Sequence, residues 1–194
     1  MTAGADTRGA RLGMWLFLFT EIMLFGGLFV LYAAYYFRYR PDFIAGGARL
    51  ELGLGALNTV LLLVSSFTAA AACRAVERRP GRSAALLAVT VALGLAFLGN
   101  KYVEWGDKFG QGIMPGSERM LGLPRGQQIF FGMYFMLTGL HALHVLAGTA
   151  VLGAFVPLAL RSRLRPVVLD NGALYWHLVD IVWIYLFPLL YLIP

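Results

Sequence analysis

The residues of this sequence that could do chemistry are histidines and acids set in apolar surroundings. His177 and Asp180 lie three residues apart in ALYWHLVDIVWIYLF, and His141 and His144 have the same spacing in YFMLTGLHALHV. Residues three apart on a helix project from nearly the same face. Glu21 adds a carboxyl group within GMWLFLFTEIMLFGG. Imidazole and carboxyl groups in such a setting could carry protons, ligate a metal ion or hydrogen-bond neighbouring helices.

A metal site is one interpretation of these residues. The two histidine-bearing pairs and Glu21 would together supply nitrogen and oxygen ligands. However, di-iron bundles use Glu-x-x-His pairs and zinc proteases use His-Glu-x-x-His, and neither spacing occurs here. Hydrogen bonds between the two segments, with Asp180 orienting a histidine, explain the same residues without a metal. We therefore predict no metal ligand and no catalytic residue in this chain.

Glu21 lies deep within the first apolar run of the sequence. An ionised carboxylate at that depth needs a partner, or else the group takes up a proton. The functional interpretations are a proton-carrying carboxyl, a metal ligand, or an anchor for lipid headgroups and water. The structural interpretation is a hydrogen-bonded glutamate that bridges two helices. We treat Glu21 as an intramembrane carboxyl related to protons or lipid.

Further polar residues lie inside or beside apolar runs. Lys101 and Glu104 are three apart near the end of a run, which favours an ion pair at the membrane interface; the alternative is that Glu104 reaches inward towards the neighbourhood of Glu21. Asn58 and Thr59 could hydrogen-bond a neighbouring helix. The predicted polar network between helices comprises His141, His144, His177, Asp180, Glu104, Asn58 and Thr59.

The composition places this chain in a membrane. Hydrophobic residues make up 59% of the 194 residues and charged residues only 13%, whereas a soluble domain is about one quarter charged. The net charge of +6 comes almost entirely from arginines in short connections between apolar runs. That pattern sets topology beside lipid headgroups and argues against a nucleic-acid surface. The single cysteine, Cys73, rules out an intrachain disulfide and a cysteine-based metal cage.

Five apolar runs are long enough to cross a bilayer. They cover Leu12–Phe37, Leu52–Arg74, Ser83–Trp105, Gln128–Leu160 and Ala173–Ile193. The sequence therefore predicts an all-α fold, in which residues 1–194 form one domain, a compact integral membrane bundle of five transmembrane helices. Small residues let helices approach closely in lipid, so Gly26–Gly27 and the regularly spaced Gly132, Gly139 and Gly153 are predicted at helix contacts.

The arginines predict how this bundle is oriented. Short turns after the second and fourth runs contain Arg74, Arg78, Arg79, Arg82, Arg161, Arg163 and Arg165. Positive charge in short loops marks the cytoplasmic side, so we expect the amino terminus in the cytoplasm and the carboxyl terminus outside. Aromatic residues near the ends of the runs, among them Trp15 and Tyr191, are expected at the membrane interface.

Five segments together resemble the haem–copper oxidase subunit III family. They are GMWLFLFTEIMLFGG, LNTVLLLVSS, LGLAFLGNKYVEW, YFMLTGLHALHV and YWHLVDIVW, which occur in the family's order and cover nearly the whole chain. By position, Glu21 matches the family's buried carboxyl and Glu104 the acid of its E-aromatic pair. His141, His144, His177 and Asp180 match the TGxHxxH and WHxVDxVW positions. Seven-helix members have two additional amino-terminal helices, so the chain resembles the short five-helix bacterial form.

The resemblance implies a non-catalytic subunit of a respiratory terminal oxidase, which reduces oxygen and pumps protons. The implied partners are the catalytic subunit I, subunit II and membrane lipids, in the bacterial inner membrane. Haem and copper are expected in those partner subunits and none in this chain, whose implied roles are stabilising the complex, holding phospholipid and supporting proton uptake. The alternative is an accessory protein of the same fold associated with nitric oxide reductase.

Overall fold

The computed structural model describes residues 3–192, and all of its regular elements are helices, which confirms the predicted all-α fold. The long helices are α1 (Ala3–Arg38), α3 (Leu52–Ala75), α4 (Pro80–Gly110), α6 (Arg125–Leu160) and α7 (Pro166–Phe187). Two short helices, α2 (Arg40–Gly47) and α5 (Glu118–Leu121), were not expected from the sequence, and a π-helical turn, η1 (Pro188–Leu192), continues α7.

The five long helices confirm the number and order of the predicted spans. Each is long and apolar enough to cross a membrane, with the last span running through η1 to Leu192. A helix satisfies its own backbone polar groups, as hydrocarbon requires. The helices extend beyond the predicted ends, so the connection expected over Gly106–Gln127 is shorter and contains α5. Ile193, the last residue of the fifth predicted span, lies outside the described residues. The chain is a multi-pass membrane protein.

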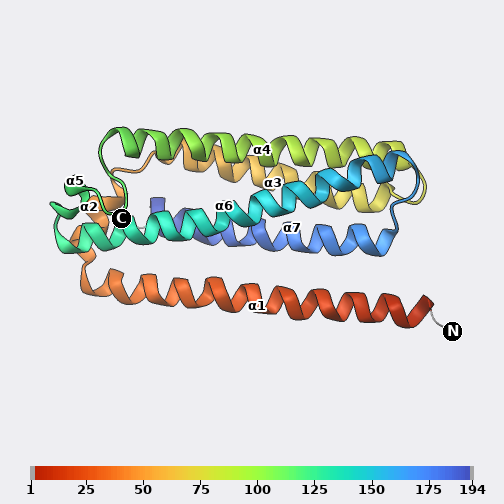
Figure 1. Cartoon of the computed structure of the whole chain (residues 1–194), viewed down its shortest axis with the longest axis horizontal. Helices are drawn as coiled ribbons and strands as arrows, with labels where there is room; N and C mark the ends of the chain where they lie inside the picture. Colours follow the sequence, from red (N-terminus) through yellow and green to blue (C-terminus); the bar gives the residue numbers. More distant parts are fainter. Residues whose placement is uncertain (1–2, 193–194) are drawn as a thin grey trace.

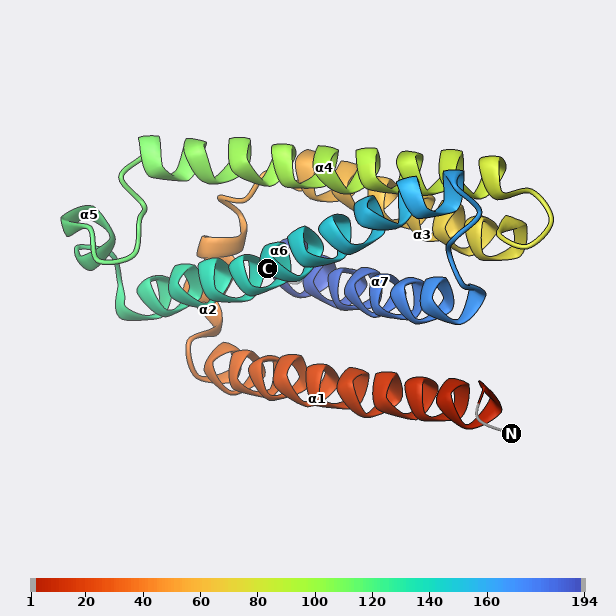
Figure 2. The same cartoon turned by 45° about the vertical axis from the view of Figure 1, so that its right-hand side comes forward.

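Four helices form the core, while α1 lies to one side of it. Helices α3, α4, α6 and α7 pack together, and α1 runs alongside α7 and α6 (Figures 1 and 2). Only 11% of the most apolar stretch of α1 is buried, against 44% for the span that contains α7. The predicted five-helix bundle is therefore present, with α1 held along one edge rather than enclosed.

The two ends of the molecule differ in charge and covering. The arginine-rich α3–α4 and α6–α7 turns lie at the end where α1 begins (Figure 1). Pro80 and Pro166 begin the helices after these turns, at positions where the missing amide hydrogen costs nothing. Helices α2 and α5 cover the other end, where buried Phe43 of α2 packs edge-on against Tyr32 and Phe130.

The closest glycine contacts occur at positions other than those predicted. No neighbouring atom approaches the open side of Gly26–Gly27 or of Gly132 within 4 Å. A side-chain carbon at Gly139 would lie 3.4 Å from Trp105, and one at Gly153 would lie 3.9 Å from Val91, which are ordinary contacts. Tighter contacts include those at Gly94 of α4 and Gly148 of α6, where the indole of Trp176 lies against both helices. A fully buried tryptophan needs this room, so its position explains why no larger residue fits at Gly94 and Gly148.

Candidate functional site

Glu21 of α1 and His144 of α6 form a hydrogen-bonded pair within the membrane-spanning part of the molecule. The Glu21 Oε2 and His144 Nε2 atoms are 2.9 Å apart, and both side chains are 15% exposed. The other ring nitrogen, Nδ1, lies 2.8 Å from the carbonyl oxygen of Leu140. The position of Glu21 thus fits the bridging interpretation, with His144 as its partner.

Hydrogen-bond chemistry fixes the proton count of this pair. The Leu140 carbonyl oxygen can only accept, so His144 Nδ1 must carry a hydrogen. The bond between Nε2 and Glu21 then needs one further proton, held either by the carboxyl group or by the imidazole. In both cases the pair has no net charge. A neutral pair is the arrangement that a partly lipid-exposed position favours.

Lys101 and Glu104 form a second polar cluster, in the interior of the bundle. Lys101 Nζ donates to Glu104 Oε2 at 2.9 Å and to the hydroxyl of Tyr191 at 3.0 Å. The hydroxyls of Tyr134 and Tyr191 both donate to Glu104 Oε1. The Lys101 ammonium also faces the ring of Trp183 at 5.3 Å. The cluster joins α4, α6 and η1 through one closed set of bonds.

This cluster corrects two expectations from the sequence. The Lys101–Glu104 pair is not at the membrane interface, because Lys101 is 2% exposed and Glu104 is fully buried. Glu104 does reach inward, but its partners are Lys101, Tyr134 and Tyr191, whereas Glu21 pairs with His144. Tyr191 is likewise buried and bonded to this pair rather than anchored at the interface. Position near the end of a run misled both expectations, since the Tyr191 hydroxyl of η1 reaches Lys101 and Glu104 of α4 in the interior.

Helix α3 presents a row of hydroxyl and amide groups to its neighbours. The Asn58 side-chain oxygen accepts a bond from Asn100 of α4. On the side facing α7, Thr59 accepts from the indole of Trp183 and Ser65 from that of Trp176. Ser66 lies 2.6 Å from His177 Nδ1. The predicted contacts of Asn58 and Thr59 with neighbouring helices are present in the structure, and Ser65 and Ser66 extend the row.

His141 and Asp180 are buried without a hydrogen-bond partner in the described part of the chain. Both His141 ring nitrogens and both Asp180 carboxyl oxygens are unpaired. His141 lies between the rings of Phe97 and Trp183, at 5.4 and 5.2 Å. The expected bond from Asp180 to a histidine is therefore absent. Of the seven residues predicted as one network, His144, His177, Glu104, Asn58 and Thr59 form separate hydrogen-bonded contacts, and His141 and Asp180 form none among the described residues.

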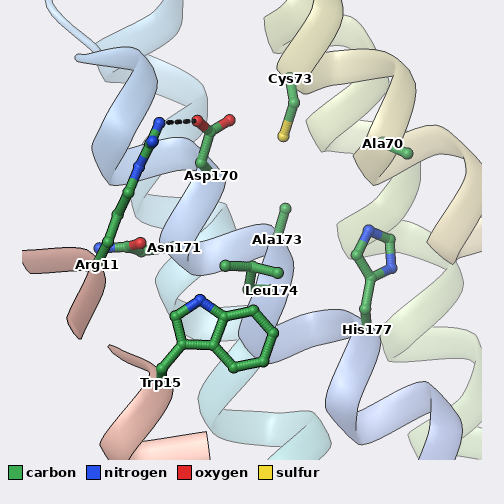
Figure 3. Close-up of a pocket in the computed structure, with 9 residues that line it drawn as sticks. All are labelled: Arg11, Trp15, Ala70, Cys73, Asp170, Asn171, Ala173, Leu174 and His177. Atoms are coloured by element: carbon green, nitrogen blue, oxygen red, sulfur yellow. Dashed lines mark ion pairs between the residues drawn. The ribbon is translucent and has the colours of Figure 1, made fainter. Parts of the chain in front are cut away.

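A groove opens between α1, α3 and α7 beside His177. Its volume is about 440 Å³, and Figure 3 shows the residues that line it. Arg11 of α1 pairs with Asp170 of α7 at 3.7 Å at one end of the groove. Cys73 of α3 lies near this ion pair, and His177 of α7 faces the groove further in. The groove thus reaches from the ion pair at the arginine-rich end to His177, further along α7.

The structure disperses the residues that a metal site would need. Glu21 and His144 lie between α1 and α6, whereas His177 contacts α3. Within residues 3–192, no three His, Cys, Asp or Glu side chains gather in a way that could hold a metal ion. The ligand set considered in the sequence analysis is not brought together.

Several residues with defined contacts were not singled out in the sequence. Tyr134 and Ser66 lie in the quoted segments YFMLTGLHALHV and LNTVLLLVSS, yet neither type stands out in a membrane helix. Ser65 and Ser66 offered a signal, because two adjacent hydroxyls inside an apolar run are suited to hydrogen bonds with residues of a neighbouring helix. Tyr134 gave none, because only the fold brings it to Glu104.

The chain is similar to known proteins over the whole region in which these contacts lie. The family model described as cytochrome c oxidase subunit III matches residues 2–193. Cytochrome bo(3) ubiquinol oxidase subunit 3 of Pseudomonas aeruginosa is 33% identical, over 93% of this chain and 83% of its own length. Cytochrome c oxidase subunit 3 of Thermostichus vulcanus is 28% identical, over 94% and 86%. Heme-copper oxidase subunit I+III of Aeropyrum pernix is 30% identical, over 94% of this chain and 22% of its own length.

These relatives bear on the two functions considered from the sequence. All three carry oxidase names, so the nitric oxide reductase alternative gains no support from them. The resemblance seen in the five sequence motifs is confirmed by a match over nearly the full chain. The chain belongs to the cytochrome c oxidase subunit III family.

Proposed function

We propose that this chain is the non-catalytic subunit III of a respiratory haem–copper oxidase, which reduces oxygen and pumps protons. The observation that carries this proposal is the family match over residues 2–193. Relatives named as subunits of quinol and cytochrome c oxidases align with more than nine-tenths of this chain. The chain would act by stabilising its complex and by supporting proton uptake in a neighbouring subunit.

The proposed partners are subunits I and II of the oxidase. The Aeropyrum pernix relative, whose name joins subunits I and III in one chain, supports a position beside subunit I. The one-sided packing of α1 is consistent with a chain that completes its surroundings with other subunits or lipid. Haem and copper would be held by the partner subunits, and this chain would bind phospholipid but no metal.

The proposed location is the bacterial inner membrane, with the amino terminus in the cytoplasm. The arginine-rich turns gather at the end where α1 begins (Figure 1). Positive charge in short loops is retained on the cytoplasmic side. This end would therefore face the cytoplasm, and α2 and α5 would lie on the outer side.

Co-purification tests the proposed function directly. An affinity tag on this chain should bring down haem-bearing subunits in mild detergent. Deleting the chain should leave the haem spectra of the membranes present but weaken sustained oxygen consumption or the durability of the complex. Recovery of this chain without any haem-bearing partner, together with normal sustained oxygen consumption and proton pumping in the deletion strain, would contradict the proposal.

A further inference from the structure

An arginine-lined pocket lies where α3 and α4 meet their connecting turn, at the end of the molecule where α1 begins (Figure 1). Its volume is about 490 Å³. The basic residues that line it are all exposed, and they are Arg74, Arg78, Arg79 and Arg82. Ala70 and Cys73 of α3 line the groove beside α1 and α7 instead, so this pocket lies on a different face of α3.

These four positive charges have no negative partner in the described part of the chain. No ion pair among residues 3–192 includes any of the four arginines. Glu77, the one acid of the turn, lines a different pocket together with Leu164. Arg74 and Arg78 are one helical turn apart on α3, a spacing at which like charges repel. An anion bound between the arginines would offset this repulsion.

The pocket becomes apolar towards the interior of the membrane. Phe67 lines it, is 66% exposed, and lies about 16 Å before Arg78 along α3. On α4, Leu86 lies one turn further in than Arg82. A guanidinium group binds phosphate oxygens through paired N–H donors. A ligand that matches the whole pocket therefore combines an anionic phosphate with a hydrocarbon chain.

We propose that this pocket binds one anionic phospholipid, with its phosphate among the four arginines and an acyl chain along Phe67 and Leu86. Free inorganic phosphate would use only the charged end, so the exposed apolar part favours the lipid. The inference names a site for the phospholipid binding proposed for this chain, and it rests on that part of the proposed function. It does not depend on the haem-bearing partners.

Native mass spectrometry of the complex purified with this chain would test the site. After the complex is stripped of lipid in mild detergent, phosphatidylglycerol is titrated back, and phosphatidylcholine, whose headgroup has no net charge, serves as the comparison. The wild type should bind at least one phosphatidylglycerol more tightly than phosphatidylcholine. In Arg78→Gln/Arg82→Gln this binding should weaken about tenfold or more, because each arginine near an anionic headgroup contributes to its retention.

Arg163→Gln/Arg165→Gln is the matched control. It removes the same charge from the α6–α7 turn, at the same end of the molecule, and neither residue lines this pocket. Its binding of phosphatidylglycerol should match that of the wild type. Where Arg78→Gln/Arg82→Gln does not assemble, the single variant Arg82→Gln should weaken binding about fivefold.

The proposal is overturned if the pocket variants bind phosphatidylglycerol as tightly as the wild type. It is also overturned if excess inorganic phosphate displaces the bound lipid, which would indicate a site for free anions. Loss of a partner subunit in place of lipid would overturn it too and assign the arginines to an acidic protein surface. Haem-bearing subunits should co-purify equally with the wild type and the variants. A chain that retains phosphatidylglycerol but no haem-bearing subunit would contradict the oxidase role and support the lipid site.

Discussion

Lys101 and Glu104 place opposite charges in the interior of the bundle, where both charged groups have hydrogen-bond partners. Lys101 Nζ has three oxygen partners, and both Glu104 oxygens accept bonds. Removing one partner of a buried pair leaves the other charge uncompensated, whereas replacing both can be nearly neutral. The contributions of Lys101 and Glu104 to the stability of the bundle therefore depend on each other.

Substitutions in this cluster should be strongly non-additive. We expect Glu104→Leu to destabilise the chain by about 3–5 kcal/mol, because it strands the Lys101 ammonium. The double variant Lys101→Met/Glu104→Leu should regain most of that loss. Thermal unfolding of the purified complex, followed for both variants, measures the difference. Equal destabilisation by the single and double variants would show that the charge pair is not the controlling interaction.

The Glu21–His144 pair predicts a different pattern, because only a hydrogen bond is needed there. In Glu21→Gln the amide can donate to His144 Nε2, so assembly should remain intact. In Glu21→Leu this bond is lost, at a cost of about 1 kcal/mol, typical of one interhelical bond in a membrane. Comparing the unfolding temperatures of the two variants checks this. If Gln and Leu destabilise equally, the bond does not hold α1.

Among the helices of the core, the packing of Trp176 sets how closely α4, α6 and α7 approach one another. The indole lies against Gly94 and Gly148, and its Nε1 donates to Ser65 of α3. One side chain on α7 thus contacts the three other helices of the core. No extra carbon fits at either glycine unless the indole shifts.

Two glycine substitutions on the same helix test this packing. A methyl group at Gly148 would meet the Trp176 ring at 2.7 Å, whereas one at Gly132 would meet nothing within 4 Å. We expect Gly148→Ala to destabilise the chain by about 1–3 kcal/mol through overpacking. Gly132→Ala should be neutral or slightly stabilising, since alanine favours helix. Tryptophan fluorescence and thermal unfolding follow both; a stable Gly148→Ala with unchanged fluorescence would contradict the prediction.

The sequence predicted the helices well and their contacts poorly, for one physical reason. A span is encoded by its own residues, so the runs that contain Glu21, His141 and His177 could be recognised singly. A contact depends on two segments and on how each helix is rotated about its axis. Because these spans carry apolar residues on every face, their sequence does not reveal that rotation. Hence the partner of His144 and the burial of Tyr191 emerged only from the fold, while Asn58 and Thr59 could be expected to reach a neighbour wherever it lay.

The arginines gather at one end of the molecule, so its proposed orientation in the membrane can be tested. Glu77, in the α3–α4 turn, and Gly122, after α5, are both exposed and belong to opposite ends. In a Cys73→Ala background, Glu77→Cys should react with a membrane-impermeant thiol reagent only from the cytoplasmic side. Gly122→Cys should react only from the outside. The reverse pattern would invert the proposed orientation.

Helix α1 is fastened to the core at separate points along its length. Its polar attachments are the Glu21–His144 bond, the Arg11–Asp170 pair, the bond from Asn171 to the carbonyl oxygen of Ala10 and the bond from Tyr32 to the carbonyl oxygen of Leu189. Aromatic contacts with α7 lie between them, such as that of Phe17 with Tyr175. Little continuous packing surface joins these points, as the small buried share of α1 indicates.

This arrangement has a consequence for how the protein is made. Helix α1 precedes the other spans in the chain, yet its attachment points lie on α6, α7 and η1, which follow all the rest. During synthesis, α1 enters the membrane before α6, α7 and η1, the elements to which it attaches, have been made. Since α4 packs against both α3 and α6, these three helices can assemble before α1 attaches, and the docking of α1 becomes the last step of folding.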